Sequence, residues 1–292
     1  MNGQNVGGGE PGRREMTTHP VMQSRVPRRQ FLAGCAVCAA ASFVPSILFA
    51  QQQPLPAASP GAQGLVDDLV AANRILSQEG IVDAYGHVSV RHTTAANRFL
   101  LSRSVAPELV TAADIMEYDL DGNAISPAGR SSYLERFIHS EIYRARSDVN
   151  AIVHCHTPSI IPFGASTVPL RPMYHMSSFI AQGVPVFDIR DAGGMTDMLV
   201  KDGRLGRALA HVLADKPAAL MRGHGAVVVG HTIPTVVARS IYLDVNARLQ
   251  AQAIALGGRV TYLDPEEARR WDATNGTYDR AWELWKRKAM PK

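Results

Sequence analysis

The segment 151–156 (Ala-Ile-Val-His-Cys-His) constrains this chain more than any other. Its apolar start predicts a buried β-strand. Successive strand side chains point to opposite faces, so His154 and His156 share one face and Cys155 points away from them. Neutral imidazole is the commonest protein ligand for zinc and neighbouring transition metals, and catalytic sites often combine three protein ligands with one open position. The pattern therefore indicates a metal site, although paired histidines also occur at strand ends without a metal.

Two further segments carry groups that suit such a site. Upstream, Glu135 and His139 lie four residues apart in a pattern that predicts a helix over residues 133–146, with Ser131 or Ser132 as its N-cap. Downstream, residues 223–225 (Gly-His-Gly) place a third histidine between two glycines, ahead of the apolar run 226–229. Both segments strengthen the prediction of a metal site.

Composition and charge exclude some functions. The 292 residues are 46% hydrophobic and 19% charged, as in ordinary globular proteins. Five of the thirty basic residues and two of the twenty-six acidic ones lie in residues 1–50, so the remainder holds 25 basic and 24 acidic residues. No basic stripe with interleaved aromatic residues is present in that remainder. We therefore expect no nucleic-acid partner.

The N-terminal excess of charge belongs to an export pattern. Arg28 and Arg29 precede an apolar run over residues 33–49 that ends at Ala50. A basic region, an apolar stretch and a small terminal residue predict a twin-arginine signal peptide over residues 1–50, hence a periplasmic protein that meets the membrane only during export. The alternative is an uncleaved anchor, but the run is short for a spanning helix, which needs about twenty residues.

The rest of the chain predicts one α/β domain. Residues 51–64, rich in Pro, Gln and Ala, are expected to be a linker, and helix and strand patterns alternate over residues 65–265 without a repeat or a Pro/Gly-rich break. A long helix is predicted from Thr232 to Gly257, and the tail 266–292, with three tryptophans, is expected to be a docked helix. Cys155 would be the only cysteine left after export, so no intrachain disulfide is expected.

Four phrases, taken in order, resemble the class II aldolase/adducin superfamily over Leu65–Leu263. The phrases are residues 86–91, the Glu135/His139/Tyr143 triplet, residues 148–156 and residues 223–225. The resemblance implies a three-layer α/β/α sandwich around a mixed, mostly antiparallel sheet, commonly as a homotetramer with active sites between subunits. It also implies that His154, His156 and His224 bind one divalent ion, zinc or manganese. Glu135 corresponds to the family's acid/base carboxylate, which can also bind the metal.

The chain departs from the sugar-phosphate aldolases where those enzymes hold phosphate. A Thr-Pro-Ser-Gly loop is replaced by residues 101–104 (Leu-Ser-Arg-Ser), and a Ser-Ser pair before the glutamate is replaced by Tyr133-Leu134. Phosphate needs small hydroxyl donors and open backbone amides, so a small-molecule carboxylate is the expected substrate instead. We expect Arg91 and Arg103 to clamp carboxylates, or else to form structural ion pairs. The substrate side of the site would be completed by Ser102, Ser104 and Tyr133.

The amino-acid sequences of three segments are similar to those of the decarboxylase branch of the superfamily. The segments are residues 86–92, 101–108 and 133–139. That branch includes hydroxycarboxymuconic semialdehyde decarboxylase and decarboxylases of hydroxylated aromatic or pyridine dicarboxylates. The resemblance implies a metal-dependent carbon–carbon lyase in which the metal stabilises an enolate-like anion and an acid then protonates the carbon. Glu135 is the first candidate for that acid. His175, near the position of an acid/base tyrosine in the aldolases, is the second, with a purely structural histidine as the alternative.

Three other histidines and three other functions complete these expectations. His87, His92 and His139 are expected to pack around the site rather than to bind the metal. An aldolase or dehydratase acting on a non-phosphorylated hydroxy acid would release no CO₂. A non-catalytic adducin-like module need not keep the metal ligands, and an iron-dependent oxygenase would require O₂.

Overall fold

The computed structural model describes residues 60–275 and 278–290, within a compact unit that spans residues 55–292. The predicted signal peptide and residues 51–59 of the predicted linker lie outside the described residues. The first helix, α1 (Pro60–Gln78), begins five residues before residue 65, where the α/β domain was predicted to start. Proline suits the first position of a helix because its φ is already helical and its missing N–H is not needed there. Residues 60–64 therefore belong to α1 and not to a linker.

A single eight-stranded sheet forms the centre of this unit, in the order β4-β3-β2-β1-β5-β8-β7-β6. Every neighbouring pair is antiparallel except β6 and β7, which are parallel. The strand predicted over residues 151–156 is confirmed to within one residue at each end. The strands are β1 (His87–Arg91), β2 (Arg98–Ser102), β3 (Ile115–Asp119), β4 (Ala124–Ile125), β5 (Ala151–Cys155), β6 (Val186–Phe187), β7 (Ala218–Met221) and β8 (Gly225–Gly230).

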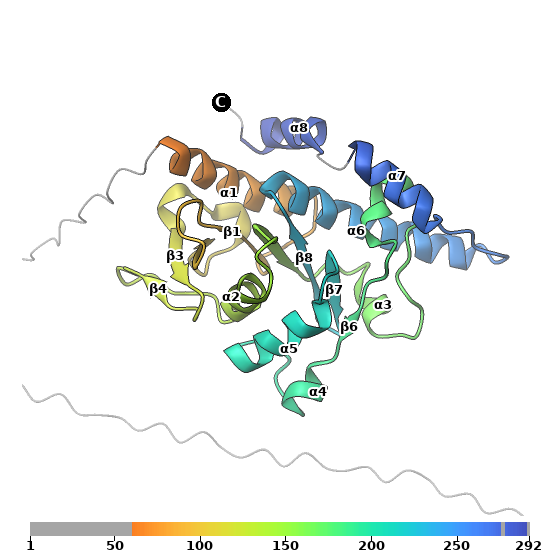
Figure 1. Cartoon of the computed structure of the whole chain (residues 1–292), viewed down its shortest axis with the longest axis horizontal. Coiled ribbons are helices and arrows are strands. Elements are labelled where there is room, and N and C mark those ends of the chain that lie inside the picture. The colour runs from red at the N-terminus through yellow and green to blue at the C-terminus, as the bar shows by residue number, and fades with distance from the viewer. Residues whose placement is uncertain (1–59, 276–277, 291–292) are drawn as a thin grey trace, which may run out of the picture. The chain divides into compact units, whose positions relative to one another are not determined.

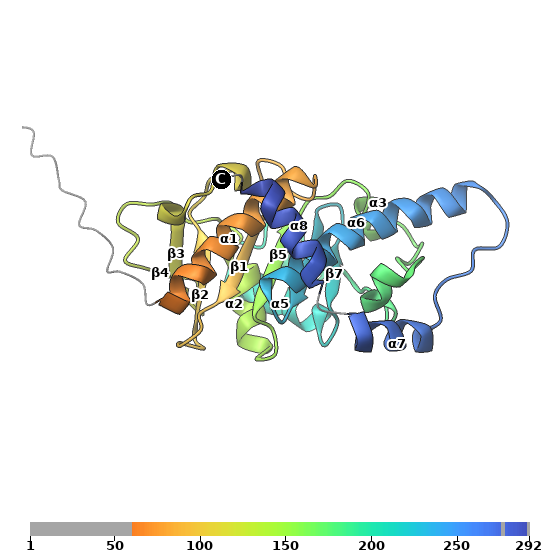
Figure 2. The same cartoon turned by 90° about the horizontal axis from the view of Figure 1, so that it is seen from above.

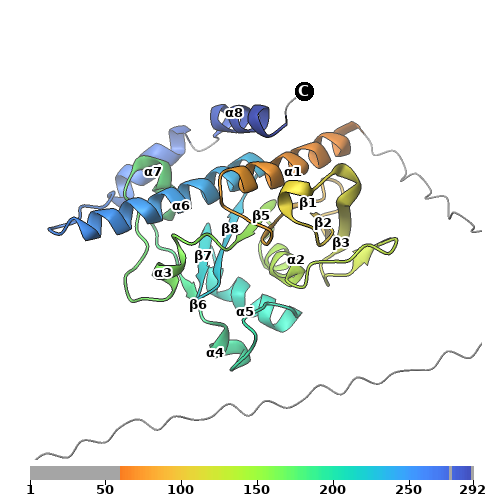
Figure 3. The same cartoon turned by 180° about the vertical axis from the view of Figure 1, so that it is seen from behind.

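Helices cover both faces of this sheet, so the predicted three-layer α/β/α sandwich is confirmed. α1, α6 and α8 lie on one side, and α2 and α5 lie against each other on the other side (Figure 1). The view from behind shows the same two layers with the sheet between them (Figure 3). The remaining helices are α2 (Arg136–Ala145), α3 (Ile161–Gly164), α4 (Ile189–Gly193), α5 (Gly203–Leu213), α6 (Ile233–Ala255), α7 (Pro265–Asn275), α8 (Asp279–Ala289) and the 3₁₀ turns η1 (Pro107–Leu109), η2 (Ala112–Asp114) and η3 (His175–Ile180).

The alternation of β5 side chains divides the interior into two apolar cores. Val153 and Cys155 pack with α1 and α6 on one face, and Ile152 packs with α2 and α5 on the other. Because His154 shares the parity of Ile152, it points to the α2 side. Cys155 is a buried free thiol whose pKa is raised by burial. The predicted separation of Cys155 from the histidines is confirmed.

The C-terminal half follows the prediction with one refinement. The long helix α6 begins after Thr232, whose hydroxyl accepts a hydrogen bond from the Thr235 amide at 3.2 Å, and it ends just before Gly257. The predicted helical tail consists of two helices, of which α8 packs across α1 and α6 through the buried Trp282 and Trp285 (Figure 2). Within residues 60–275 and 278–290, no helix combines the length and apolar character that crossing a membrane requires.

Helix α2 is shorter than predicted, and the difference matters for Glu135. The helix begins at Arg136 rather than at residue 133, and neither Ser131 nor Ser132 caps it. The Ser132 hydroxyl instead accepts a hydrogen bond from the Tyr118 hydroxyl at 3.0 Å. Glu135 occupies the residue before the helix with φ −89° and ψ 18°, and its side chain caps nothing. Its carboxylate is therefore free to reach across the sheet face.

Candidate metal centre

Four side chains from three separate parts of the chain converge beside the end of β5. They are Glu135 from the start of α2, His154 from β5, His156 just beyond it, and His224 from the turn between β7 and β8. Their ligand atoms all lie within 4.8 Å of one another. His156 Nε2 is 3.0 Å from Nε2 of both His154 and His224, and Glu135 Oε2 is 3.4 Å from the same two nitrogens.

These separations fit a single metal ion. Two atoms that each bond a metal at about 2.0–2.2 Å, with an angle of 90–110° between them, lie roughly 2.9–3.5 Å apart. The His154 Nδ1–H donates to the Ala226 carbonyl at 3.1 Å, which leaves the Nε2 lone pair facing the cluster. Three nitrogens and one carboxylate oxygen are donors that suit a divalent transition metal. The residues present therefore fit the ion that the sequence predicted.

The two glycines beside His224 are required by the turn that carries it. Gly223 has φ +63°, a conformation that favours glycine. A Cβ on Gly225 would lie 2.0 Å from the Cys155 carbonyl oxygen, closer than any real contact. The absence of a side chain at 225 thus lets the backbone of β8 approach the strand that carries His154 and His156.

Without a metal, the carboxyl group of Glu135 and the imidazole of His156 already have the protonation states that metal ligands need. Burial alone would raise the pKa of Glu135, but His154 and His224 outweigh that effect and hold the pKa below its usual range. Its second oxygen, Oε1, accepts a hydrogen bond from the Val200 amide at 2.9 Å. Burial, followed by the neighbouring His154, lowers the pKa of His156 to about 4. The carboxylate is therefore ionised and the His156 imidazole neutral near pH 7.

A buried chain of hydrogen bonds runs behind the cluster. His87 Nδ1 is 2.6 Å from His139 Nε2, His139 Nδ1 is 2.6 Å from the Ser89 hydroxyl, and that hydroxyl is 2.8 Å from the Tyr143 hydroxyl. Burial lowers the pKa of His139 to about 3, with His154 adding to the effect, and raises the pKa of Tyr143. As expected, His87 and His139 pack around the site without being ligands.

The remaining histidine of that group lies elsewhere. His92 follows β1 and is partly exposed, with Nε2 4.0 Å from Glu117 Oε1. It contacts no member of the cluster through a hydrogen bond.

Arg91 donates hydrogen bonds to the protein's own backbone, and its role as a substrate clamp stays a prediction. Its guanidinium donates hydrogen bonds of 2.7–3.0 Å to four backbone carbonyls. It also lies over the Tyr143 ring, 4.7 Å from the centroid. Donors that are already committed to the backbone are not available to a carboxylate ligand. The four acceptors are the carbonyls of Ala96, Tyr143, Arg146 and Val149.

Of the four other predicted substrate residues, only Tyr133 lies beside the cluster. The Tyr133 ring lies 4.5 Å from the His87 ring, and its hydroxyl donates to the Val105 carbonyl. Arg103 Nε forms a 2.5 Å ion pair with Asp114, the structural alternative stated above. The Ser102 hydroxyl is buried and directed at Tyr133, and Ser104 is exposed. The structure therefore places Tyr133 beside the site by its ring and not by a free hydroxyl.

His175 does not reach the metal cluster within one chain. It is exposed at the start of η3, which packs on α6 and α7, on the opposite side of the sheet from α2. Its ring lies 5.4 Å from that of Trp271. Within one chain, His175 is therefore not among the residues that gather at the cluster. His175 was predicted from its similarity in sequence position to the aldolase tyrosine. That similarity does not show whether the residue acts in its own chain or in a neighbouring copy.

A pocket of about 380 Å³ adjoins the cluster at His156. Its other walls come from the end of α1 and the loop that follows it, residues 80–83, with the exposed Asp83. Sequence reasoning missed this loop. In the sequence, Gly86 marks the end of this loop. Its φ is +89°, and a Cβ there would lie 2.9 Å from the His154 carbonyl oxygen.

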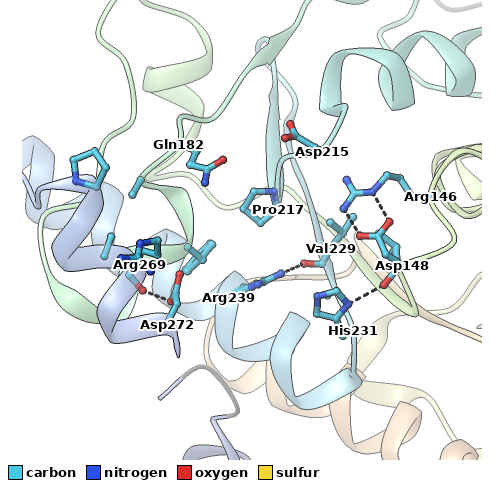
Figure 4. Close-up of a pocket in the computed structure, with 17 residues that line it drawn as sticks. Arg146, Asp148, Gln182, Asp215, Pro217, Val229, His231, Arg239, Arg269 and Asp272 are labelled. Atoms are coloured by element: carbon cyan, nitrogen blue, oxygen red, sulfur yellow. Dashed lines mark hydrogen bonds and ion pairs between the residues drawn. The ribbon is translucent and has the colours of Figure 1, made fainter. Parts of the chain in front are cut away.

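A second pocket, of about 310 Å³, lies at the opposite end of β5 and β8 (Figure 4). Arg146 and Asp148 form an ion pair of 2.7 Å there, and His231 Nδ1–H donates to the Asp148 carbonyl at 2.8 Å. Arg239 donates to the Val229 carbonyl at 2.7 Å. None of the four cluster residues lines this pocket, and several of its polar groups bond to one another.

The fold and the cluster together define an α/β/α protein of class II aldolase architecture with a His/Glu cluster that could hold a metal ion. The family model described as Class II Aldolase and Adducin N-terminal domain matches residues 67–251, and the chain belongs to this family. The resemblance stated from the sequence is confirmed.

Several known proteins are similar to this chain. The decarboxylase tropJ of Talaromyces stipitatus is 34% identical over 257 residues, which cover 80% of this chain and 95% of tropJ. The 3,4-dihydroxyphthalate decarboxylase of Arthrobacter keyseri is 28% identical, over 74% of this chain and 89% of its own length. Among solved structures, L-fuculose 1-phosphate aldolase from Glaciozyma antarctica PI12 superposes with a TM-score of 0.65 at 26% identity, over 81% of this chain and 93% of its own.

Proposed function

We propose that this protein is a metal-dependent carbon–carbon lyase that decarboxylates a hydroxylated carboxylate, either a semialdehyde or an aromatic acid. The observation that carries the proposal is the convergence of His154, His156, His224 and Glu135 in a chain that is similar to decarboxylases over most of its length. These residues would hold a divalent ion, zinc or manganese, which when bound would act as a Lewis acid for negative charge on the substrate.

The surroundings of the cluster favour a carboxylate over a sugar phosphate. The hydroxyl of Tyr133 is already bonded to the Val105 carbonyl, so this position offers a ring face and not a hydroxyl donor. The next residue, Leu134, is exposed and apolar. Phosphate binding relies on convergent hydroxyl and amide donors, which these two residues do not provide.

Glu135 serves this reaction as an anion. Its lowered pKa keeps the free carboxyl ionised, and the Val200 amide holds Oε1 while Oε2 faces His154 and His224. An ionised carboxylate binds the metal or accepts a proton, so its role as the acid requires that it first take up a proton during the reaction.

We further propose a homotetramer in which His175 serves the site of a neighbouring copy. The support is that His175 is exposed and lies apart from its own cluster. Mixing His175→Ala and His154→Ala proteins tests this directly. Mixed oligomers should recover turnover that neither variant shows alone, and light scattering should give the mass of four chains. Failure to recover turnover under subunit exchange would leave His175 with a structural role only.

Export remains a proposal as well. The arginine pair and apolar run in residues 1–50 support a twin-arginine signal and a periplasmic location.

The function is tested by supplying the metallated protein with ortho-hydroxy and β-keto carboxylates. Metal content is measured by elemental analysis, and CO₂, aldehyde and O₂ are followed in parallel. We expect one CO₂ per substrate, without O₂ consumption and with a solvent proton on the carbon that lost it. Aldehyde without CO₂ would establish an aldolase, and strict dependence on O₂ would establish an oxygenase.

A further inference from the structure

Three arginines line the pocket at the opposite end of β5 and β8 from the metal cluster (Figure 4). The pocket has a volume of about 310 Å³, and its walls come from the loop before β5, the end of β8, η3, α6 and α7. Strand β8 spans Gly225–Gly230 between the two places, and a strand rises about 3.4 Å per residue, so they lie roughly 17 Å apart. The pocket is therefore separate from the metal cluster.

Two of these arginines are neutralised by carboxylates of the protein. Arg146 donates from Nε and Nη2 to the two oxygens of Asp148, each at 2.7 Å. Arg269 donates from Nε and Nη2 to the two oxygens of Glu266, at 2.9 and 2.7 Å. Because both pairs are bidentate, neither arginine is left with an uncompensated charge.

Arg239, on α6, is the third arginine and has no such partner. Its Nη1 donates to the Val229 carbonyl at 2.7 Å, and its guanidinium carbon lies 5.6 Å from the centroid of the Phe179 ring. Among the residues that the structure describes, no carboxylate oxygen lies within 4.0 Å of the guanidinium, and no group accepts a hydrogen bond from Nη2. Nε is enclosed without a partner, whereas Nη2 is not among the enclosed atoms. Nη2 is therefore the donor that opens on the pocket.

The charge of Arg239 requires compensation. Burial lowers the pKa of the guanidinium, but an arginine remains charged in proteins. A charged group away from water is stable only when it is paired or hydrogen-bonded. An oxyanion at Nη2 would supply both, because hydrogen bonds between a guanidinium and an anion are among the strong ones. The pocket therefore suits an anion.

Asp272, on α7, limits the charge of that anion. It lines the same pocket, and one of its oxygens accepts a hydrogen bond from the Ser178 hydroxyl. It raises the pKa of Arg239 through space, but the two groups form no ion pair of 4.0 Å or less. Its negative charge repels a dianion such as hydrogen phosphate about twice as strongly as a monoanion. A small carboxylate carries a single negative charge and fits a volume of about 310 Å³.

We propose that this pocket is a second ligand site, which binds a small monoanionic carboxylate through a hydrogen bond from Arg239 Nη2. The Phe179 ring and the Val229 carbonyl hold the guanidinium in place for this contact. The inference goes beyond the proposed function, because no residue of the metal cluster takes part in it.

The test follows the Arg239 side chain of the zinc-loaded protein by ¹⁵N NMR. Its Nε–H is enclosed and therefore shielded from exchange with water, and its signal is assigned by its absence in Arg239→Lys. Titration with acetate should shift this signal in a saturable manner. Acetamide has nearly the same shape without the charge and should leave the signal in place. Phosphate should bind more weakly than acetate, because Asp272 repels its dianion.

Three variants separate the charge of Arg239 from other effects. Binding is followed in each by the backbone amide signal of Gly230, which lines the pocket. Arg239→Gln should weaken acetate binding by about 10- to 100-fold, as expected for loss of a hydrogen bond between charged groups. Asp272→Asn should strengthen it, because a repelling carboxylate is removed. Arg270→Gln is the matched control, since it removes the same charge from α7 outside the pocket, and it should leave the affinity unchanged.

Three results would overturn the inference. They are no response of the Arg239 Nε–H signal to acetate, an equal response to acetamide, and wild-type affinity in a folded Arg239→Gln protein. If that variant does not fold, the comparison of acetate with acetamide and the effect of Asp272→Asn still decide. Absence of decarboxylation concerns the metal cluster alone and leaves this test unchanged.

Discussion

Replacing Gly225 by alanine should loosen the metal centre by displacing the strand that carries two of its ligands. The new Cβ would lie 2.0 Å from the Cys155 carbonyl oxygen and 3.0 Å from the His156 Cα. Since real Cβ contacts essentially never fall below 3.0 Å, β8 and β5 must separate by about 1 Å at this point. Metal and catalytic constellations tolerate displacements of only about 0.5 Å. The substitution therefore moves His156 beyond that tolerance.

Two magnitudes follow from this displacement. Overpacking of a filled interior typically costs about 1–3 kcal/mol of unfolding free energy, which is roughly 2–12 °C in Tm for a domain of this size. Loss of the support that orients a ligand typically lowers metal affinity about 10- to 100-fold. Urea unfolding of the metal-free protein measures the first effect. Competition with a chromogenic chelator for zinc measures the second.

Gly164 provides the matched control for this substitution. Its added Cβ would meet its nearest neighbours at 3.5 Å, an ordinary contact, so Gly164→Ala should change stability by less than about 0.5 kcal/mol and leave zinc affinity unchanged. Wild-type zinc affinity in Gly225→Ala would refute the argument that the glycine sets the approach of the two strands.

Four other substitutions test separate parts of the structure. His154→Ala should reduce the metal content to a substoichiometric level and abolish turnover, and elemental analysis showing full occupancy would contradict the ligand assignment. Glu135→Gln keeps the shape but removes the titrating group, so turnover should fall by about 10²–10⁴-fold with metal retained; loss of metal would instead make Glu135 chiefly a ligand. Arg91→Lys should lower the unfolding free energy by about 1–3 kcal/mol, because one ammonium cannot donate to all four carbonyls. KM should be unchanged. A raised KM at unchanged stability would support the prediction that Arg91 binds the substrate. Lysine at both Arg28 and Arg29 should keep the precursor in the cytoplasm, and processed protein in the periplasm at wild-type levels would exclude the twin-arginine route.

The local features of the site could be predicted from the amino-acid sequence. The alternation of strand side chains is set by covalent geometry, so the shared face of His154 and His156 and the opposite orientation of Cys155 could be predicted without a structure. The cap and breaker residues around the long helix similarly predicted α6, because Thr232 and Gly257 act through the nearest turns of the backbone. The residue patterns also pointed to His224 and Glu135, and the family resemblance assigned them to the same metal ion as His154 and His156.

Which polar groups are available for chemistry could be seen only once the chain's distant segments were placed in space. Arg91 and Arg103 look alike in the sequence. The first is bonded to carbonyls of nearby Ala96 and of the distant segment 143–149, and the second to the Asp114 carboxylate across a loop. His175 has the chemistry of an acid, yet it lies across the sheet from the metal ligands. The buried hydrogen-bond chain from His87 to Tyr143 joins residues about fifty positions apart. A hydrogen bond is decided by distance and angle in space, and residue spacing along the chain does not specify either one once the intervening segments have folded.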